Sequence, residues 1–148
     1  MTDGTRRIQS SQIEVSRLMG IANRDLEQAQ LEVLHSDTRF SLAYNAALQL
    51  ATVALRLEGV RVRKDAFHAR TFAELKERLP KDKAHIADYF DRARRKRHAA
   101  AYEQVNVVSS SELDDLVEQV KQFREWVEPA VREVGMAESS DDEQARSD

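Results

Sequence analysis

Apolar residues recur at steps of three and four along most of the chain, the spacing that places them on one face of an α-helix. The first series covers residues 11–35 and consists of Val15, Leu18, Ala22, Leu26, Ala29 and Val33. The second begins at Ser36-Asp37, a potential N-cap, and ends at Gly59, a residue typical of the position after a helix. Its apolar positions extend almost around the helix, so we expect it to be the most buried element.

Three further helices are predicted in the second half of the chain. The first is short and ends at Pro80, and its apolar face consists of His68, Phe72, Leu75 and Leu79. The next follows Asp82, and its face consists of Ile86, Tyr89 or Phe90, Ala93, Arg97 and Ala100 or Ala101. After a predicted loop over residues 102–109, a capping-box pattern at Ser111 to Asp114 starts the last helix, which we expect Pro129 to kink or end.

The pattern predicts an all-α protein, an antiparallel four-helix bundle with one extra short helix. Only four glycines and two prolines occur in the 148 residues, too few for the many turns of a sandwich, a barrel or a glycine-rich nucleotide fold. One domain is expected for this length. We predict a flexible N-terminus over residues 1–10, the bundle over residues 11–134 and a disordered acidic tail over residues 135–148.

Several classes of site have no support in the sequence. The chain has no cysteine and its four histidines lack metal-ligand spacing, so we expect no metal site and no cofactor. Motifs for acyl transfer and for phosphate-binding loops are absent. No signal peptide or apolar run long enough for a membrane span is visible, which predicts a cytoplasmic protein without a membrane partner.

Charge is unevenly distributed along the chain. The formal net charge is −3, but residues 137–148 contain five acidic residues against one arginine, a local charge of −4. The remaining residues therefore carry +1. Within them, five basic residues stand together without an acid: Arg92, Arg94, Arg95, Lys96 and Arg97. This run is a candidate nucleic-acid-binding surface.

The basic run continues into His98 and Tyr102, and Arg97 stands where the apolar face requires a core residue. At about 100° per residue, Arg94, Arg95, His98 and Tyr102 share one edge of the helix beside Arg97. A guanidinium, an imidazole and a phenol grouped in this way suit a phosphodiester, because arginine binds phosphate through two N–H groups and histidine transfers protons near neutral pH. The alternative is a solvated run that complements the helix dipole.

Three other side chains could carry chemistry, but their positions favour packing. His68 shares a face with Phe72 and Leu75, which is typical of a core or interface histidine. Tyr44 lies on the buried face of the second helix, where we expect its ring in the core and its hydroxyl at the rim. Trp126 stands beside Phe123, and we expect it to pack rather than to stack on a base.

The chain resembles the HEPN family, helical-bundle domains common in bacterial toxin–antitoxin and phage-defence systems. The resemblance covers roughly residues 11–133. It rests on the helix order and on four segments, which are Ser41 to Leu48, Gly59 to Arg61, His68 to Phe72 and Arg94 to Glu103.

The resemblance implies a catalytic motif in which an arginine and a polar residue precede a histidine, with two copies meeting across a homodimer. In the implied metal-independent mechanism, histidine assists attack by the ribose 2′-hydroxyl and arginine stabilises the developing charge. On this chain Arg97 is the motif arginine, His98 the polar residue and Tyr102 stands at the histidine position. A phenol is a poor base at neutral pH, so we expect weak or lost cleavage. By count alone, Arg92 and His98 also fit.

Three functions stay open at this stage. The first is a dimeric module that binds RNA, or a partner protein, through the basic run. The second is an active, metal-independent ribonuclease toxin using Arg97, His98 and Tyr102. The third is an antitoxin-like interaction protein without activity. The resemblance implies a homodimer, with RNA and a cognate protein such as a nucleotidyltransferase as possible partners.

Overall fold

The computed structural model describes residues 2–102 and 107–146, with side chains described for residues 12–102 and 107–135. The described residues form five α-helices and no strand: α1 (Thr2–Gln28), α2 (Ser36–Leu57), α3 (Phe67–Arg78), α4 (Ala84–Tyr102) and α5 (Ser110–Arg146). This confirms the predicted all-α class and the order of four long helices and one short one.

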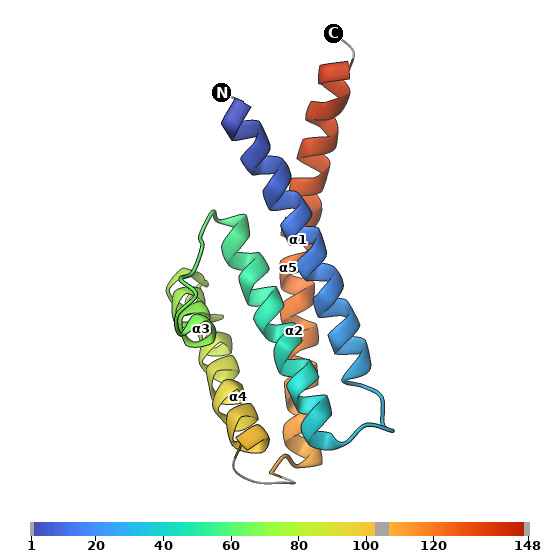
Figure 1. Ribbon diagram of the computed structural model, residues 1–148, viewed down its shortest axis with the longest axis vertical. Coiled ribbons are helices and arrows are strands. Elements are labelled where there is room, and N and C mark those ends of the chain that lie inside the picture. The colour runs from blue at the N-terminus through green and yellow to red at the C-terminus, as the bar shows by residue number, and fades with distance from the viewer. Residues whose placement is uncertain (1, 103–106, 147–148) are drawn as a thin grey trace.

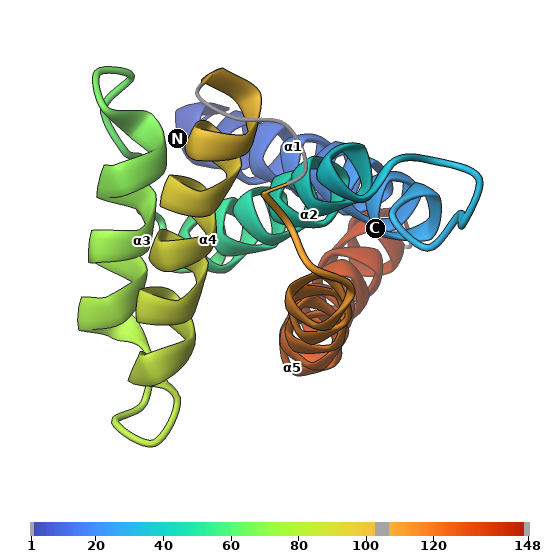
Figure 2. The same cartoon turned by 90° about the horizontal axis from the view of Figure 1, so that it is seen from below.

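Helix α2 lies at the centre and packs against each of the other four helices. Helices α1 and α2 form an antiparallel pair, α5 packs on α2, and α3 and α4 form a second pair on the other side of α2 (Figure 1). Helix α3 is seen almost end-on in Figure 1 and side-on in Figure 2, so the second pair runs across the direction of α2. The prediction that α2 is the most buried element is confirmed, since half of its residues are buried.

A series of aromatic contacts joins α2, α3, α4 and α5. The ring of Tyr44 meets Phe72 at 6.0 Å between centroids, Phe72 meets Phe90 at 6.0 Å, and Phe90 meets Phe123 at 5.5 Å. Tilted and edge-to-face pairs of this kind are favourable beyond the area that they bury. The series ends at Trp126, which stacks on Phe123 as expected of a packing residue.

The predicted stop at Gly59 is confirmed, and it has a defined geometry. Gly59 adopts a left-handed φ of 76°, its N–H donates to the carbonyl of Arg56 at 2.9 Å, and the N–H of Val60 donates to the carbonyl of Leu55 at 2.9 Å. These two bonds form a Schellman motif, which satisfies carbonyls that the end of a helix leaves unpaired. Glycine suits this position because it adopts the left-handed conformation without a Cβ clash.

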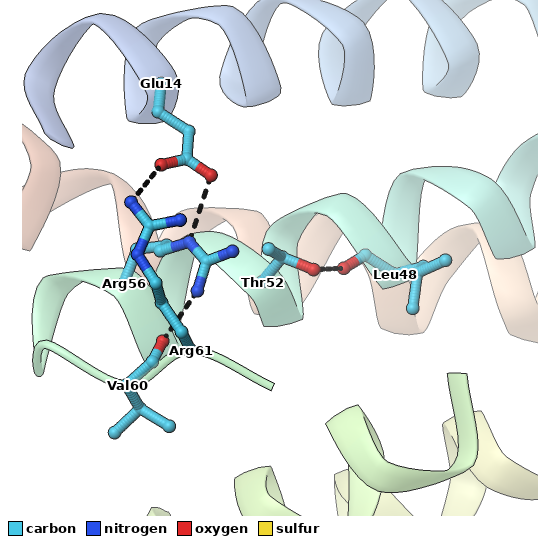
Figure 3. Close-up of polar contacts among 6 residues, drawn as sticks. All are labelled: Glu14, Leu48, Thr52, Arg56, Val60 and Arg61. Carbon is cyan, nitrogen blue, oxygen red and sulfur yellow. Dashed lines mark hydrogen bonds and ion pairs between the residues drawn. The ribbon is translucent and has the colours of Figure 1, made fainter. Parts of the chain in front are cut away.

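An ion-pair cluster fixes α1 against the end of α2 (Figure 3). Glu14 accepts from Arg56 at 3.0 Å and from Arg61 at 3.1 Å, and Arg56 also donates to the carbonyl of Val60 at 2.9 Å. Burial alone would raise the pKa of Glu14, but the hydrogen bonds and charges of the two arginines outweigh it and lower the pKa. One arginine therefore connects α1, α2 and the segment that follows α2.

Two helices have N-cap residues that differ from the predicted ones. The N-cap of α2 is His35, whose Nδ1 accepts from the N–H of Asp37 at 3.1 Å. The capping box of α5 is formed by Ser109 and Glu112, since Ser109 Oγ accepts from the N–H of Glu112 and the Glu112 carboxylate accepts from the N–H of Ser109. The box thus starts two residues before the predicted Ser111, because the glutamate three residues after Ser109 reaches back to the N–H of this N-cap residue.

Two helices are longer than the apolar pattern indicated. Pro129 lies inside α5, which continues to Arg146. Because Pro129 and Glu125 are exposed, water can satisfy the carbonyl that the missing N–H leaves unpaired. Helix α1 begins at Thr2, within the segment predicted as flexible, and α5 enters the predicted tail. The predicted loop at 102–109 is described only at Tyr102, where α4 ends, and at residues 107–109.

Among the described residues, no helix is both long and apolar enough to cross a membrane.

The capping box yields a test of the register at which α5 begins. Ser109→Ala should lower the free energy of unfolding by about 1 kcal/mol, because it leaves the N–H of Glu112 without its acceptor. Urea denaturation of the full chain, monitored by circular dichroism, measures the change. The matched control is Ser111→Ala, which should alter stability by less than about 0.5 kcal/mol. A larger loss for the control would place the cap at Ser111 instead.

Candidate nucleic-acid interface

Three of the five residues in the basic run are paired with acids. Arg94 and Arg95 both contact Asp91, at 2.8 and 2.7 Å, and Lys96 contacts Glu112 on α5 at 3.0 Å. Burial alone would raise the pKa of Asp91, but its hydrogen bonds and charge interactions with the two arginines lower it instead. The positive charge of the run is thus partly balanced within the molecule.

The other two basic residues of the run contact aromatic rings. The guanidinium of Arg92, on an exposed side chain, lies 5.8 Å from the ring centroid of Tyr89. That of Arg97 lies 5.3 Å from the ring centroid of Tyr44 on α2. Among the described residues, neither arginine has a carboxylate partner, and the Nε of Arg97 is buried without a hydrogen bond. Arg97 therefore occupies the core-facing position that its spacing predicted, but as a cation without an anion.

Tyr44 holds His68 beside this cation. Tyr44 has no exposed surface, and its hydroxyl lies 2.8 Å from Nδ1 of His68 on α3. Burial raises the pKa of Tyr44, although the positive charges of Arg97 and Arg94 lower it in part. Burial, followed by the charges of Arg97 and Arg94, lowers the pKa of His68. At neutral pH this imidazole is therefore uncharged. We name the group formed by Tyr44, His68 and Arg97 the Arg97 cluster.

His98 and Tyr102 form a separate pair. Helix α4 continues to Tyr102, as the predicted grouping requires, and the two rings lie 4.8 Å apart between centroids in a tilted arrangement. Both residues are exposed, Tyr102 to 78%. Because about 140° of helix rotation separates Arg97 from Tyr102, Arg97 turns toward the core while Tyr102 turns toward solvent. Within one chain, the structure brings Arg97 together with Tyr44 and His68, and His98 together with Tyr102.

The entrance to α3 sets the position of His68. Ala66 adopts a left-handed conformation with φ 51° and ψ 38°, and Phe67 begins the helix immediately after it. No side chain caps this end of the helix. A left-handed alanine costs roughly 1 kcal/mol, so the surrounding packing must hold the turn in place. The contacts of His68 with Tyr44, and of Phe67 and Phe72 with the core, supply that packing.

Sequence reasoning missed the acids that face the basic run. Asp91 stands three and four residues before Arg94 and Arg95, a spacing at which helical ion pairs form, so this pairing could have been found. Glu112 belongs to another helix, and no local signal identifies it. His68 and Tyr44 were correctly placed near the core, but their proximity to Arg97 depends on how three helices pack.

A second surface feature lies away from the basic run. An apolar groove of about 300 Å³ is formed by the ends of α2 and α3 and by α5. Its lining includes Leu57, Leu79, Ala130 and Trp126, which is 39% exposed. Charged residues at this groove include Glu58, which pairs with Arg78, and Glu133. The groove is a candidate surface for contact with another protein.

The all-helical fold agrees with a comparison against known families. The sequence model of the SAV_6107-like HEPN family matches residues 31–128, two thirds of the chain. The chain belongs to the HEPN family. The match includes α2, α3 and α4 and half of α5, and thus both the Arg97 cluster and the pair of His98 and Tyr102. No curated protein and no solved structure matches the chain.

The structure offers little to a metal ion. Among the described residues of this HEPN domain, no three His, Asp or Glu side chains are grouped closely enough to hold one. The donors near the Arg97 cluster are N–H groups, which bind anions.

The electrostatics of the Arg97 cluster can be tested by titration. In the wild-type protein, NMR should give His68 a pKa below the ordinary value of about 6.5, and Arg97→Gln should raise it because a nearby positive charge is removed. Since the unfolded chain binds this proton more readily, His68 should also make the protein less stable as the pH falls below about 6.5.

Arg92→Gln is the matched control for this titration, because it removes the same charge from α4 at a residue that contacts Tyr89 instead. The pKa of His68 should not change in this variant. Equal titration of His68 in wild type and Arg97→Gln would contradict the assigned interaction.

Proposed function

We propose that this protein is a HEPN module that binds RNA as a homodimer in a bacterial toxin–antitoxin or defence system, with weak or lost cleavage. One observation carries the proposal: Arg97 is a partly buried guanidinium that has no acidic partner among the described residues. Arginine binds phosphate oxygens through two parallel N–H groups, and RNA supplies such oxygens at every nucleotide. A guanidinium without an acidic partner, such as that of Arg97, can bind an anionic ligand.

The rest of the basic run adds contacts around Arg97. Arg92 and Arg95 are exposed, and Arg94 and Lys96 are partly exposed. The ion pairs of Arg94 and Arg95 with Asp91, and of Lys96 with Glu112, lie near the surface, where such pairs contribute only about 0–1 kcal/mol each. Phosphates can therefore replace the two carboxylates at small cost. The proposed interface consists of Arg92, Arg94, Arg95, Lys96 and Arg97, with His98 and Tyr102 at its end.

The residue at the motif position supports weak cleavage. The family resemblance assigns a histidine to the place of Tyr102, and a phenol donates a hydrogen bond at neutral pH but does not accept the proton of a ribose hydroxyl. The exposed ring of Tyr102 lies against His98 in a tilted arrangement. An active ribonuclease would use His98 in register with Arg92, or Tyr102 in an unusual role in register with Arg97.

A cognate protein belongs to the proposal as well. The resemblance to HEPN domains implies a homodimer and, in toxin–antitoxin systems, a partner protein such as a nucleotidyltransferase. The groove around Trp126 supports such contacts, because it leaves apolar surface uncovered in one chain. An antitoxin-like protein would depend on this groove rather than on the basic run.

RNA binding can be tested with the full chain and a fluorescent single-stranded oligoribonucleotide. Affinity, measured by anisotropy, should fall steeply as salt rises, because each phosphate contact releases counterions. Arg97→Gln should weaken binding about tenfold, the typical effect of losing one charged hydrogen bond. Arg132→Gln removes the same charge from an exposed position on α5 and should leave affinity nearly unchanged. Absence of binding at low salt, or equal loss in both variants, would contradict the proposal.

Cleavage can be tested by restoring the motif. Wild-type protein should leave the oligoribonucleotide largely intact in EDTA, whereas Tyr102→His should cleave it, because an imidazole then stands at the motif position. Denaturing gels measure the product. The double variant Tyr102→His with Arg97→Gln is the control and should not cleave. Strong cleavage by the wild type, abolished by His98→Ala, would instead identify the chain as an active ribonuclease.

A further inference from the structure

The charge environment of Arg97 differs from that of its neighbours in the basic run. Arg94, Arg95 and Lys96 each contact a carboxylate, whereas Arg97 contacts the Tyr44 ring and has no carboxylate partner among the described residues. Its Nε is buried without a hydrogen bond. A buried donor of a charged group is rarely left unpaired in a folded protein, since the lost hydration is not recovered. A hydrogen-bond acceptor on a bound ligand would give this N–H group a partner.

The second donor of the cluster is His68. Its pKa is lowered and that of Tyr44 is raised, so at neutral pH the imidazole is uncharged and the hydroxyl keeps its proton. The hydroxyl of Tyr44 has no other hydrogen-bond partner among the described residues, and we therefore assign it as the donor to Nδ1. The imidazole proton then lies on Nε2. In this state His68 offers a hydrogen-bond donor to a ligand, and its acceptor nitrogen is already used.

The two donors come from different helices and lie against the same tyrosine. Tyr44 is fully buried, whereas His68 on α3 and Arg97 on α4 are both partly exposed, so part of each side chain contacts solvent. We propose that Arg97 and His68, held by Tyr44, bind a single phosphate group within one protomer. The proposal deepens the proposed function, on which it rests for RNA as the source of that phosphate.

A phosphate group suits this cluster better than a carboxylate. When the guanidinium of Arg97 binds both oxygens of a carboxylate, the remaining lone pairs of these oxygens lie in the same plane as the guanidinium. A phosphate group has further oxygens, directed to the corners of a tetrahedron, and one of these can accept from Nε2 of His68. The nearest acid of the run, Asp91, already binds Arg94 and Arg95 and does not fill the place.

The first measurement uses the full chain and inorganic phosphate at constant ionic strength. NMR of the histidine ring nitrogens should show the Nε2–H form of His68 before any phosphate is added. Phosphate should then shift the signals of His68 and of the Arg97 Nε–H saturably, with a dissociation constant on the order of 1–10 mM. No saturable shift, or an Nδ1–H form of His68, would overturn the proposal.

Two variants separate the cluster from general charge. Arg97→Gln should abolish the saturable shift of His68, whereas Arg132→Gln, with the same loss of charge at an exposed position on α5, should retain it. Tyr44→Phe keeps the ring under Arg97 but removes the hydroxyl that fixes His68, and should weaken phosphate binding about fivefold. Circular dichroism confirms that each variant is folded. Equal phosphate responses in Arg97→Gln and Arg132→Gln would overturn the proposal.

A third measurement distinguishes the sources of the phosphate. Oligoribonucleotides with and without a 5′-phosphate should both shift His68 if the group belongs to the RNA backbone, and only the first should do so if it is a terminal phosphate. RNA binding through the basic run without any response of His68 would overturn this inference but leave the proposed function intact. A response to inorganic phosphate without RNA binding would retain the phosphate site and reject the proposed function.

Discussion

Helix α2 packs against all four other helices, and small side chains along it let them approach closely. Four alanines of α2 are fully buried and lie on more than one face of the helix: Ala43, Ala46, Ala47 and Ala51. Without a large side chain on these faces, α1, α4 and α5 can each contact the backbone of α2 closely. The orientation of every other helix therefore depends on this one, and a larger residue at any of the four positions would displace a neighbour.

The same helix connects the core to the candidate site. Tyr44 closes the aromatic series that runs through Phe72, Phe90 and Phe123, and its hydroxyl and ring face contact His68 and Arg97. The position of both side chains is thus set by core packing rather than by a loop. A site held in this way is preorganised, since the groups that would bind a ligand lose little freedom on binding.

Much of the fold follows from the spacing of apolar residues. The three- and four-residue steps identified each helix, and the wide apolar face of α2 correctly predicted its burial, because burial on all sides requires apolar residues on all sides. The register of the α5 cap was wrong because Ser109, Ser110 and Ser111 offer similar starts, and only the reach of the Glu112 carboxylate decides between them. Pro129 was a misleading signal for the end of the helix, since α5 continues beyond it with an exposed proline.

The candidate site was predicted less completely, for a different physical reason. The position of Arg97 on an apolar face indicated an unusual arginine, and the structure shows an arginine against a buried ring. Its partners lie 53 and 29 residues earlier in the chain, on α2 and α3, and helix periodicity contains no information on contacts between helices. For the same reason the pairing of Lys96 with Glu112 could not be derived.

The exposure of Tyr102 has a consequence for substitutions at this position. A side chain that is 78% exposed at the end of a helix contributes little to stability, so a single replacement there is tolerated whatever its chemistry. The residues that hold Arg97 are, by contrast, fixed by the core. A change at position 102 therefore alters the surface of α4 with little effect on the fold, whereas a change at Tyr44 alters the packing of the core.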